Sequence, residues 1–216
     1  MTTATHTGDD LRQRAIGAYL DALGSSAPTP GGGSAGGVVA ALGAALGEMV
    51  CALSAGRASG EEAEILRRAN EDLRARRADA MVAAAADERA YAAYRAAVAL
   101  PKGSDEERAV RRDAMQAALR DATDVPLALA EASEGILAAL EPVAAVGTTH
   151  ALADAQLAAY LATAALRGAL LNIRGNAGML RDPDAAARYL DAADRLERHG
   201  NALAEAVERA ALARSG

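Results

Sequence analysis

Large aromatic residues and cysteine are nearly missing from this 216-residue chain, which has no tryptophan, no phenylalanine and one cysteine. A single cysteine excludes an internal disulfide framework and a cysteine zinc site. Cys51 falls in an apolar segment, where we expect a small core side chain. The three histidines lack metal-ligand spacing, so no metal site is predicted. A core of Ala, Leu, Val and Gly is thin in volume, and its helices must therefore pack closely.

Basic clusters are also missing, and the formal net charge is −6. No run of Lys or Arg is interleaved with aromatics, which argues against a nucleic-acid partner. The polar N-terminus lacks the regions of a signal peptide, so a cytoplasmic location is the expectation. Residues 35–56 are long enough to cross a bilayer. Glu48 interrupts them and Gly and Ala are only weakly hydrophobic, so we expect no membrane association and prefer close packing of soluble helices.

Strand signals are absent, and helical spacing of apolar residues runs through most of the chain. We predict an all-α, single-domain bundle of about six helices spanning residues 1–216. Two helices that are apolar on most sides should form its buried centre. Pro126 should kink or restart the fourth helix, and Pro142 with Gly147 should mark a further break. The expected helices cover residues 9–23, 35–55, 60–100, 104–140 in two pieces, 148–180 and 183–213.

The segment Pro28-Thr29-Pro30-Gly31-Gly32-Gly33-Ser34 precedes the most apolar of these helices. Glycines allow positive φ and close approach of a ligand, and Ser34 is expected to cap a helix that begins at Ala35. Free N–H groups at this helix start would suit a carboxylate or phosphate. The segment fits neither a P-loop nor a dinucleotide-binding motif. The alternative is a plain connector into a buried helix.

Two carboxylates are candidates for acid–base chemistry. Asp87 follows four alanines, so close packing should desolvate it and raise its pKa. The alternative interpretation is that Asp87 is an ordinary surface aspartate. Asp154 is the only carboxylate between Val143 and Leu180, where Arg167 and Arg174 could pair with it; its alternative is a helix-start charge favoured by the helix dipole.

Amides and one lysine complete the candidate list. Asn172 and Asn176 are four residues apart on one helix face, where their side chains need hydrogen-bond partners. A bound ring with donors and acceptors would supply them, and so would core backbone groups. Lys102 is the only lysine in the sequence. It follows a helix-ending proline and would by itself be an ordinary surface charge.

These motifs occur in an order that resembles the formiminotetrahydrofolate cyclodeaminase / methenyltetrahydrofolate cyclohydrolase family. The resemblance starts at TPGGGSAGGVVAALGAALGEMVCALSAGR and continues through DERAY at 87–91, LPK at 100–102 and VPL at 125–127. It ends with residues 147–154 and with NIRGN at 172–176. It implies an all-helical fold and self-association as a homodimer.

The resemblance also implies roles for individual residues. Asp87 matches the family's D-x-x-A-F pattern, in which Tyr91 replaces Phe and could flank a pterin ring. Lys102 becomes a candidate contact for an anionic glutamyl tail. Asn172, Arg174 and Asn176 match the pattern N-V-R-I-N, with Gly175 replacing an apolar residue. Thr148 and Ala153 replace the Asn and Ser that the family carries before Asp154.

The sequence therefore predicts an enzyme of folate one-carbon chemistry that hydrolyses 5,10-methenyltetrahydrofolate to 10-formyltetrahydrofolate. Its substrate would be a tetrahydrofolate derivative, and no bound cofactor is expected. The closest alternative is cyclodeamination of 5-formiminotetrahydrofolate with release of ammonia. The departures at Thr148, Ala153 and Gly175 leave open a non-catalytic helical protein that binds folate or a partner.

Overall fold

The computed structural model describes residues 15–214, which form six α-helices, one short 3₁₀-helix and no strand. The predicted all-α class is confirmed. The part of the first predicted helix at residues 9–14 lies outside the described residues. The bounds are α1 Ile16–Leu23, α2 Gly32–Ala55, α3 Gly60–Val98, α4 Asp105–Val146, η2 Thr149–Ala151, α5 Leu152–Ala177 and α6 Pro183–Leu212.

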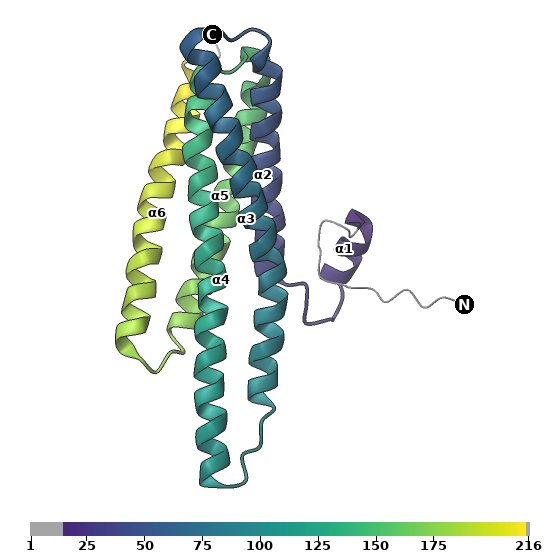
Figure 1. The fold of residues 1–216 in the computed structure, drawn as a ribbon, viewed down its shortest axis with the longest axis vertical. Coiled ribbons are helices and arrows are strands. Elements are labelled where there is room, and N and C mark those ends of the chain that lie inside the picture. Colours follow the sequence, from purple (N-terminus) through teal and green to yellow (C-terminus); the bar gives the residue numbers. More distant parts are fainter. Residues whose placement is uncertain (1–14, 215–216) are drawn as a thin grey trace, which may run out of the picture.

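Helices α2 to α6 run up and down along the long axis of the molecule (Figure 1). Helix α4 packs against α2, α3, α5 and α6 and so stands at the centre of the bundle. The α3–α4 hairpin extends past the other helices at one end, whereas α1 lies beside the start of α2. The start of α2 is therefore where the bundle, the hairpin and α1 come together.

Small residues allow the close packing that the composition demands. A Cβ atom on Gly37 of α2 would lie 2.6 Å from the Cβ of Ala84 on α3. A Cβ atom on Gly43 would lie 2.8 Å from the backbone oxygen of Ala158 on α5. Such distances leave no room for a larger residue, so backbone contact at these glycines sets how α2 sits between α3 and α5.

Two predicted helix starts are confirmed. Ser104 accepts a hydrogen bond from the Glu107 N–H at 3.1 Å, and Glu107 accepts one from the Ser104 N–H, which completes a capping box at α4. Asp182 caps α6, with Pro183 in the first turn.

The predicted restart at Pro126 is wrong, because α4 is one helix of 42 residues that contains both Pro126 and Pro142. The break predicted at Pro142 with Gly147 occurs at Gly147, which is the C-cap of α4. Pro126 has no N–H to offer to the carbonyl of Ala122, four residues earlier. The Asn176 side chain of α5 donates to that carbonyl instead, at 2.8 Å. A neighbouring helix thus replaces the hydrogen bond that the proline removes.

The two apolar helices are less buried than predicted. Helix α2 is long and apolar enough to cross a membrane by length and composition, but only 44% of its most apolar window is buried. Leu42 on α2 is 52% exposed and Leu171 on α5 is 71% exposed. Each helix buries one face against the bundle and leaves a second apolar face open, because α4 rather than α2 or α5 occupies the centre.

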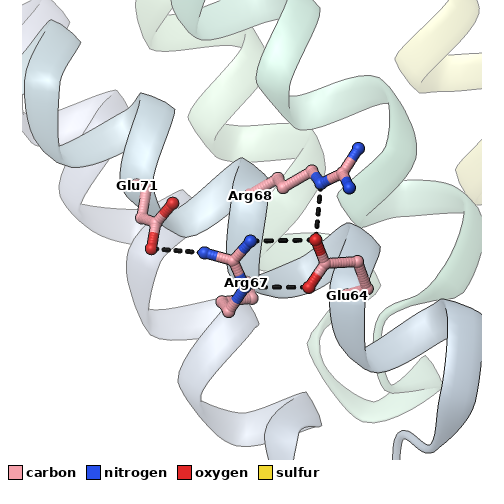
Figure 2. Close-up of polar contacts among 4 residues, drawn as sticks. All are labelled: Glu64, Arg67, Arg68 and Glu71. Carbon is pink, nitrogen blue, oxygen red and sulfur yellow. Dashed lines mark hydrogen bonds and ion pairs between the residues drawn. The ribbon is translucent and has the colours of Figure 1, made fainter.

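Helix α3 begins with a solvated charged face. Arg67 donates to Glu64 and Glu71, and Arg68 donates to Glu64, all within two turns (Figure 2). The hydrogen bonds from Arg67 and Arg68 lower the pKa of Glu64 to about 2. These side chains are exposed, and the network supports the helix locally rather than forming a site.

Candidate active site at the start of helix α2

The first turn of α2 lies under the carboxylate of Asp87 on α3. The helix begins at Gly32 with Gly31 as its N-cap, so the predicted cap at Ser34 is wrong. Ser34 instead lies inside the first turn, and its N–H donates to Oδ2 of Asp87 at 3.0 Å. This helix start was expected to bind an anion, and the Asp87 carboxylate of the protein itself supplies part of that negative charge.

Gly33 is the loop glycine that the arrangement requires. A Cβ atom on Gly33 would overlap the Asp87 carboxylate, whereas one on Gly32 would meet nothing within 4 Å. Among the described residues only Gly60 has a positive φ, so the loop glycines are not needed for left-handed backbone. The loop glycines instead allow another group to approach the backbone closely, and the position where this occurs is Gly33, against the Asp87 carboxylate. The first-turn N–H groups of Gly32 and Gly33 remain for a ligand.

A second carboxylate and a tyrosine join the site through Ser34. The hydroxyl of Tyr19 on α1 lies 3.1 Å from the Ser34 hydroxyl, and both side chains are buried. The Ser34 hydroxyl also donates to Oε1 of Glu88 at 3.4 Å. Ser34 therefore contacts both neighbouring carboxylates, one through its backbone and one through its side chain.

Burial raises the pKa of the Asp87 carboxyl above its ordinary value. The hydrogen bond from the Ser34 N–H acts in the opposite direction, and the nearby charge of Glu88 raises the pKa further. Desolvation dominates, as the four alanines before Asp87 predicted. A half-buried carboxyl whose pKa is raised by burial is better suited than an exposed aspartate to accept a proton and return it, as a general acid–base group requires.

Tyr91 and Asn172 border this region. Tyr91 is one helical turn beyond Asp87 on α3, and its ring is partly exposed. Helix α5 runs antiparallel to α2, and Gly43 faces Ala158 and Ala162. Gly31 lies 12 residues before Gly43 on α2. Because α5 runs the other way, the α5 residues about 12 positions after the Ala158–Ala162 turn lie level with Gly31 along the bundle axis. Asn172 is exposed there.

Asp154 lies at the opposite end of α2. It is half-buried in the first turn of α5, just after a corner where the Thr148 N–H donates to the Ser54 hydroxyl at 2.8 Å. Arg57 donates to the Thr148 hydroxyl at the same corner. Ser34 and Ser54 are 20 residues apart on α2, so the two ends are about 30 Å apart. One chain does not bring Asp87 and Asp154 together.

The other candidates have separate positions. Arg174 donates to Asp194 and Glu197 on α6, and not to Asp154 as proposed from the sequence. Arg167 likewise faces Asn201 on α6. Asn176 uses its amide nitrogen for the Ala122 carbonyl, which gives it a packing role. Lys102 is exposed at the tip of the α3–α4 hairpin.

Tyr19 and Glu88 were missed from the sequence. Glu88 follows Asp87 directly, and its position in the DERAY motif was the available signal. Tyr19 fitted the apolar spacing of the first helix, and no pattern indicated that its hydroxyl reaches Ser34. In the described part of the chain, no group of three or more His, Cys, Asp or Glu residues is placed to hold a metal ion.

The chain is similar to known proteins over most of its length. The family model described as formiminotransferase-cyclodeaminase matches residues 15–195. A methenyltetrahydrofolate cyclohydrolase from Methylorubrum extorquens is 39% identical over 193 residues, covering 89% of this chain and 93% of the relative. The formimidoyltransferase-cyclodeaminase of Rattus norvegicus is 37% identical over 164 residues, which is 76% of this chain but 30% of that protein.

A solved structure shares the fold. The crystal structure of a formiminotetrahydrofolate cyclodeaminase from Thermotoga maritima matches with a TM-score of 0.82 at 23% identity, over 94% of this chain and 98% of the other. Together with the family model, which covers most of the residues described above, these matches show that the chain belongs to the formiminotransferase-cyclodeaminase family.

Proposed function

We propose that this protein hydrolyses 5,10-methenyltetrahydrofolate to 10-formyltetrahydrofolate, with Asp87 as the general acid–base group. The observation that carries the proposal is the half-buried Asp87 carboxyl, held on the first turn of α2 with its pKa raised by burial. The cyclohydrolase from Methylorubrum extorquens, which this chain matches over nearly its whole length, supports the choice of reaction.

The chemistry asks for little more than such a carboxyl. Water adds to the electrophilic methenyl carbon, and Asp87 accepts one proton from it. The bond from that carbon to N5 then breaks as Asp87 returns the proton to N5. The remaining proton leaves the carbinol hydroxyl as the formyl group forms, so one proton is released overall. Positioning and proton transfer suffice in this scheme, which uses no resident cofactor.

Other groups at the site would hold the substrate. We propose that the exposed part of the Tyr91 ring flanks the pterin and that the N–H groups of Gly32 and Gly33 bind a carbonyl oxygen or an anionic group. Asn172 offers an exposed amide at a similar level of the bundle. We further propose that the protein acts as a homodimer in the cytoplasm and that Lys102 contacts a glutamyl tail.

Cyclodeamination of 5-formiminotetrahydrofolate is the second candidate, favoured by the matches to cyclodeaminases from rat and Thermotoga maritima. In that reaction N10 attacks the formimino carbon and ammonia leaves. The same carboxyl would protonate the departing nitrogen. The two reactions share the bicyclic methenyl species, so one site can be tested for both.

The test is an absorbance assay that follows the methenyl chromophore with both folates in parallel. We expect turnover of methenyltetrahydrofolate, and we expect Asp87→Asn to lower it by about a hundredfold or more with the fold retained. Asp72→Asn, an exposed aspartate on the same helix, is the matched control. Wild-type protein that binds folate but turns over neither substrate would overturn the proposal, as would an Asp87→Asn variant within about threefold of wild type.

A further inference from the structure

The first turn of α2 lacks the usual means of fixing a helix start. Its N-cap is Gly31, which makes no side-chain cap hydrogen bond, and Gly32 and Gly33 follow directly. Glycine is a weak helix former because its backbone has more freedom to lose than that of other residues. Helix ends fray, and a glycine turn without a side-chain cap does so more readily. The position of this turn therefore depends on contacts with other elements.

Ser34 makes these contacts, and its side chain is 0% exposed. Its N–H donates to Oδ2 of Asp87 on α3 at 3.0 Å, and its hydroxyl donates to Oε1 of Glu88 at 3.4 Å. The hydroxyl of Tyr19 on α1 lies 3.1 Å from the Ser34 hydroxyl. A serine hydroxyl has one hydrogen, which here is directed to Glu88, so the Tyr19 hydroxyl is the donor to Ser34.

The other fully buried hydroxyls of the described residues are used differently. Ser54, Thr123 and Ser133 each donate to the backbone carbonyl four residues earlier in their own helix. This is the local solution for a hydroxyl inside a helix. Ser34 lies in the first turn, where no helical carbonyl precedes it by four residues, and its hydroxyl bonds to α1 and α3 instead. The Ser34 hydroxyl thus connects three elements.

Helix α1 is packed on the bundle at this point. Tyr19 is the one residue of α1 that is buried, and it packs against Ala84 of α3 with Val38 of α2 beside it. Ala84 is one helical turn before Asp87 on α3. The packing of the ring determines where the Tyr19 hydroxyl lies, and this hydroxyl then meets Ser34 next to the Asp87 carboxyl.

We propose that Tyr19 is a positioning residue of the active site, which holds Ser34 so that the Ser34 N–H fixes the Asp87 carboxyl for proton transfer. The inference rests on the proposed function for the role of Asp87. Without the Tyr19 hydroxyl, the glycine turn can shift and the Ser34 N–H no longer has a fixed place beside Asp87. Small displacements of a reacting group are costly in rate, so α1 becomes a necessary part of the site.

Two small substitutions test this path. Tyr19→Phe removes the donor hydroxyl and keeps the packed ring, whereas Ser34→Ala removes the accepting hydroxyl and keeps the N–H. Each should lower kcat about five- to tenfold and leave KM within about twofold, because the lost contact acts on the chemical step. The double variant should be no slower than the slower single variant, because both changes remove the same contact.

The control is Tyr160→Phe, at an exposed tyrosine on α5, which should keep kcat within about twofold of wild type. An unchanged kcat in Tyr19→Phe would overturn the proposal. Losses that multiply in the double variant would also overturn it, because Tyr19 would then act independently of the Ser34 hydroxyl.

Amide hydrogen exchange tests the same contact without any assay of activity. Exchange of the Ser34 N–H, followed by NMR, should become about tenfold faster in Tyr19→Phe, because the first turn of α2 opens more often. The Ser54 N–H at the other end of α2 is the internal control and should not change. Unchanged exchange at Ser34, or equal acceleration at both ends, would show that Tyr19 does not hold this turn. If the wild type lacks turnover, the proposed function fails, and exchange alone decides whether Tyr19 holds Ser34.

Discussion

The hydrogen bond from Asn176 to the Ala122 carbonyl gives a quantitative test of how this fold keeps a proline inside a helix. The bond is 2.8 Å long and partly buried, between neutral groups. Its loss leaves a carbonyl that Pro126 cannot satisfy, because proline lacks an N–H. We therefore expect Asn176→Ala to lower the free energy of unfolding by about 1 to 1.5 kcal/mol. For a chain of this size that is a fall in Tm of about 2 to 6 °C.

The same substitution should cost much less once position 126 can donate. In a Pro126→Ala background the backbone N–H of residue 126 can reach the Ala122 carbonyl, so Asn176→Ala should cost under about 0.5 kcal/mol. The difference between the two backgrounds, a coupling of about 1 kcal/mol, is measured by urea unfolding of the four proteins. Asn172→Ala, an exposed asparagine one turn earlier, is the control and should change stability by less than about 0.5 kcal/mol.

Two results would refute this reasoning. An equal cost of Asn176→Ala in both backgrounds would mean that the Ala122 carbonyl is not what Asn176 serves. A fall in kcat/KM of more than about tenfold without loss of stability would mean that Asn176 binds substrate, as its match to the family pattern implied.

The remaining predictions concern the site and its approach. Gly33→Ala should displace the Asp87 carboxylate and lower kcat by about tenfold or more, whereas Gly32→Ala, which faces open space, should stay within about twofold; equal effects would make both glycines merely structural. Because burial raises the pKa of Asp87, kcat/KM should rise as pH increases through that raised pKa, and Asp87→Asn should abolish this limb of the profile. The effect of pH on stability has the opposite sign, because the folded state holds the Asp87 proton more tightly than the unfolded chain does. The contribution of Asp87 to the free energy of unfolding therefore falls as pH rises from the pKa of the unfolded state past the pKa of the folded state. Urea unfolding of Asp87→Asn should lack that fall. Lys102→Glu should raise KM for a polyglutamyl substrate several-fold more than for the monoglutamate, with the gap closing at high salt; an equal effect on both substrates would remove Lys102 from the tail site.

The sequence by itself was sufficient for the all-α class and for several helix ends. These features depend on neighbours within a few residues. Ser104 and Glu107 form their capping box within one turn, and Asp182 with Pro183 starts α6 in the same way. The desolvation of Asp87 also followed from local sequence, because the four alanines before it allow α3 to approach α2 closely.

Only the tertiary structure decided the features that depend on contacts between distant segments. Pro126 remains inside α4 because an amide 50 residues later replaces its missing donor, and no local pattern contains that information. The residues around Ser34 predict a helix cap at this position. The first turn of α2 nevertheless extends back to Gly32, because Asp87 on α3 accepts a hydrogen bond from the Ser34 N–H. The open face of α2 and α5 has the same origin: their apolar residues predicted burial, but α4 covers only one side of each helix.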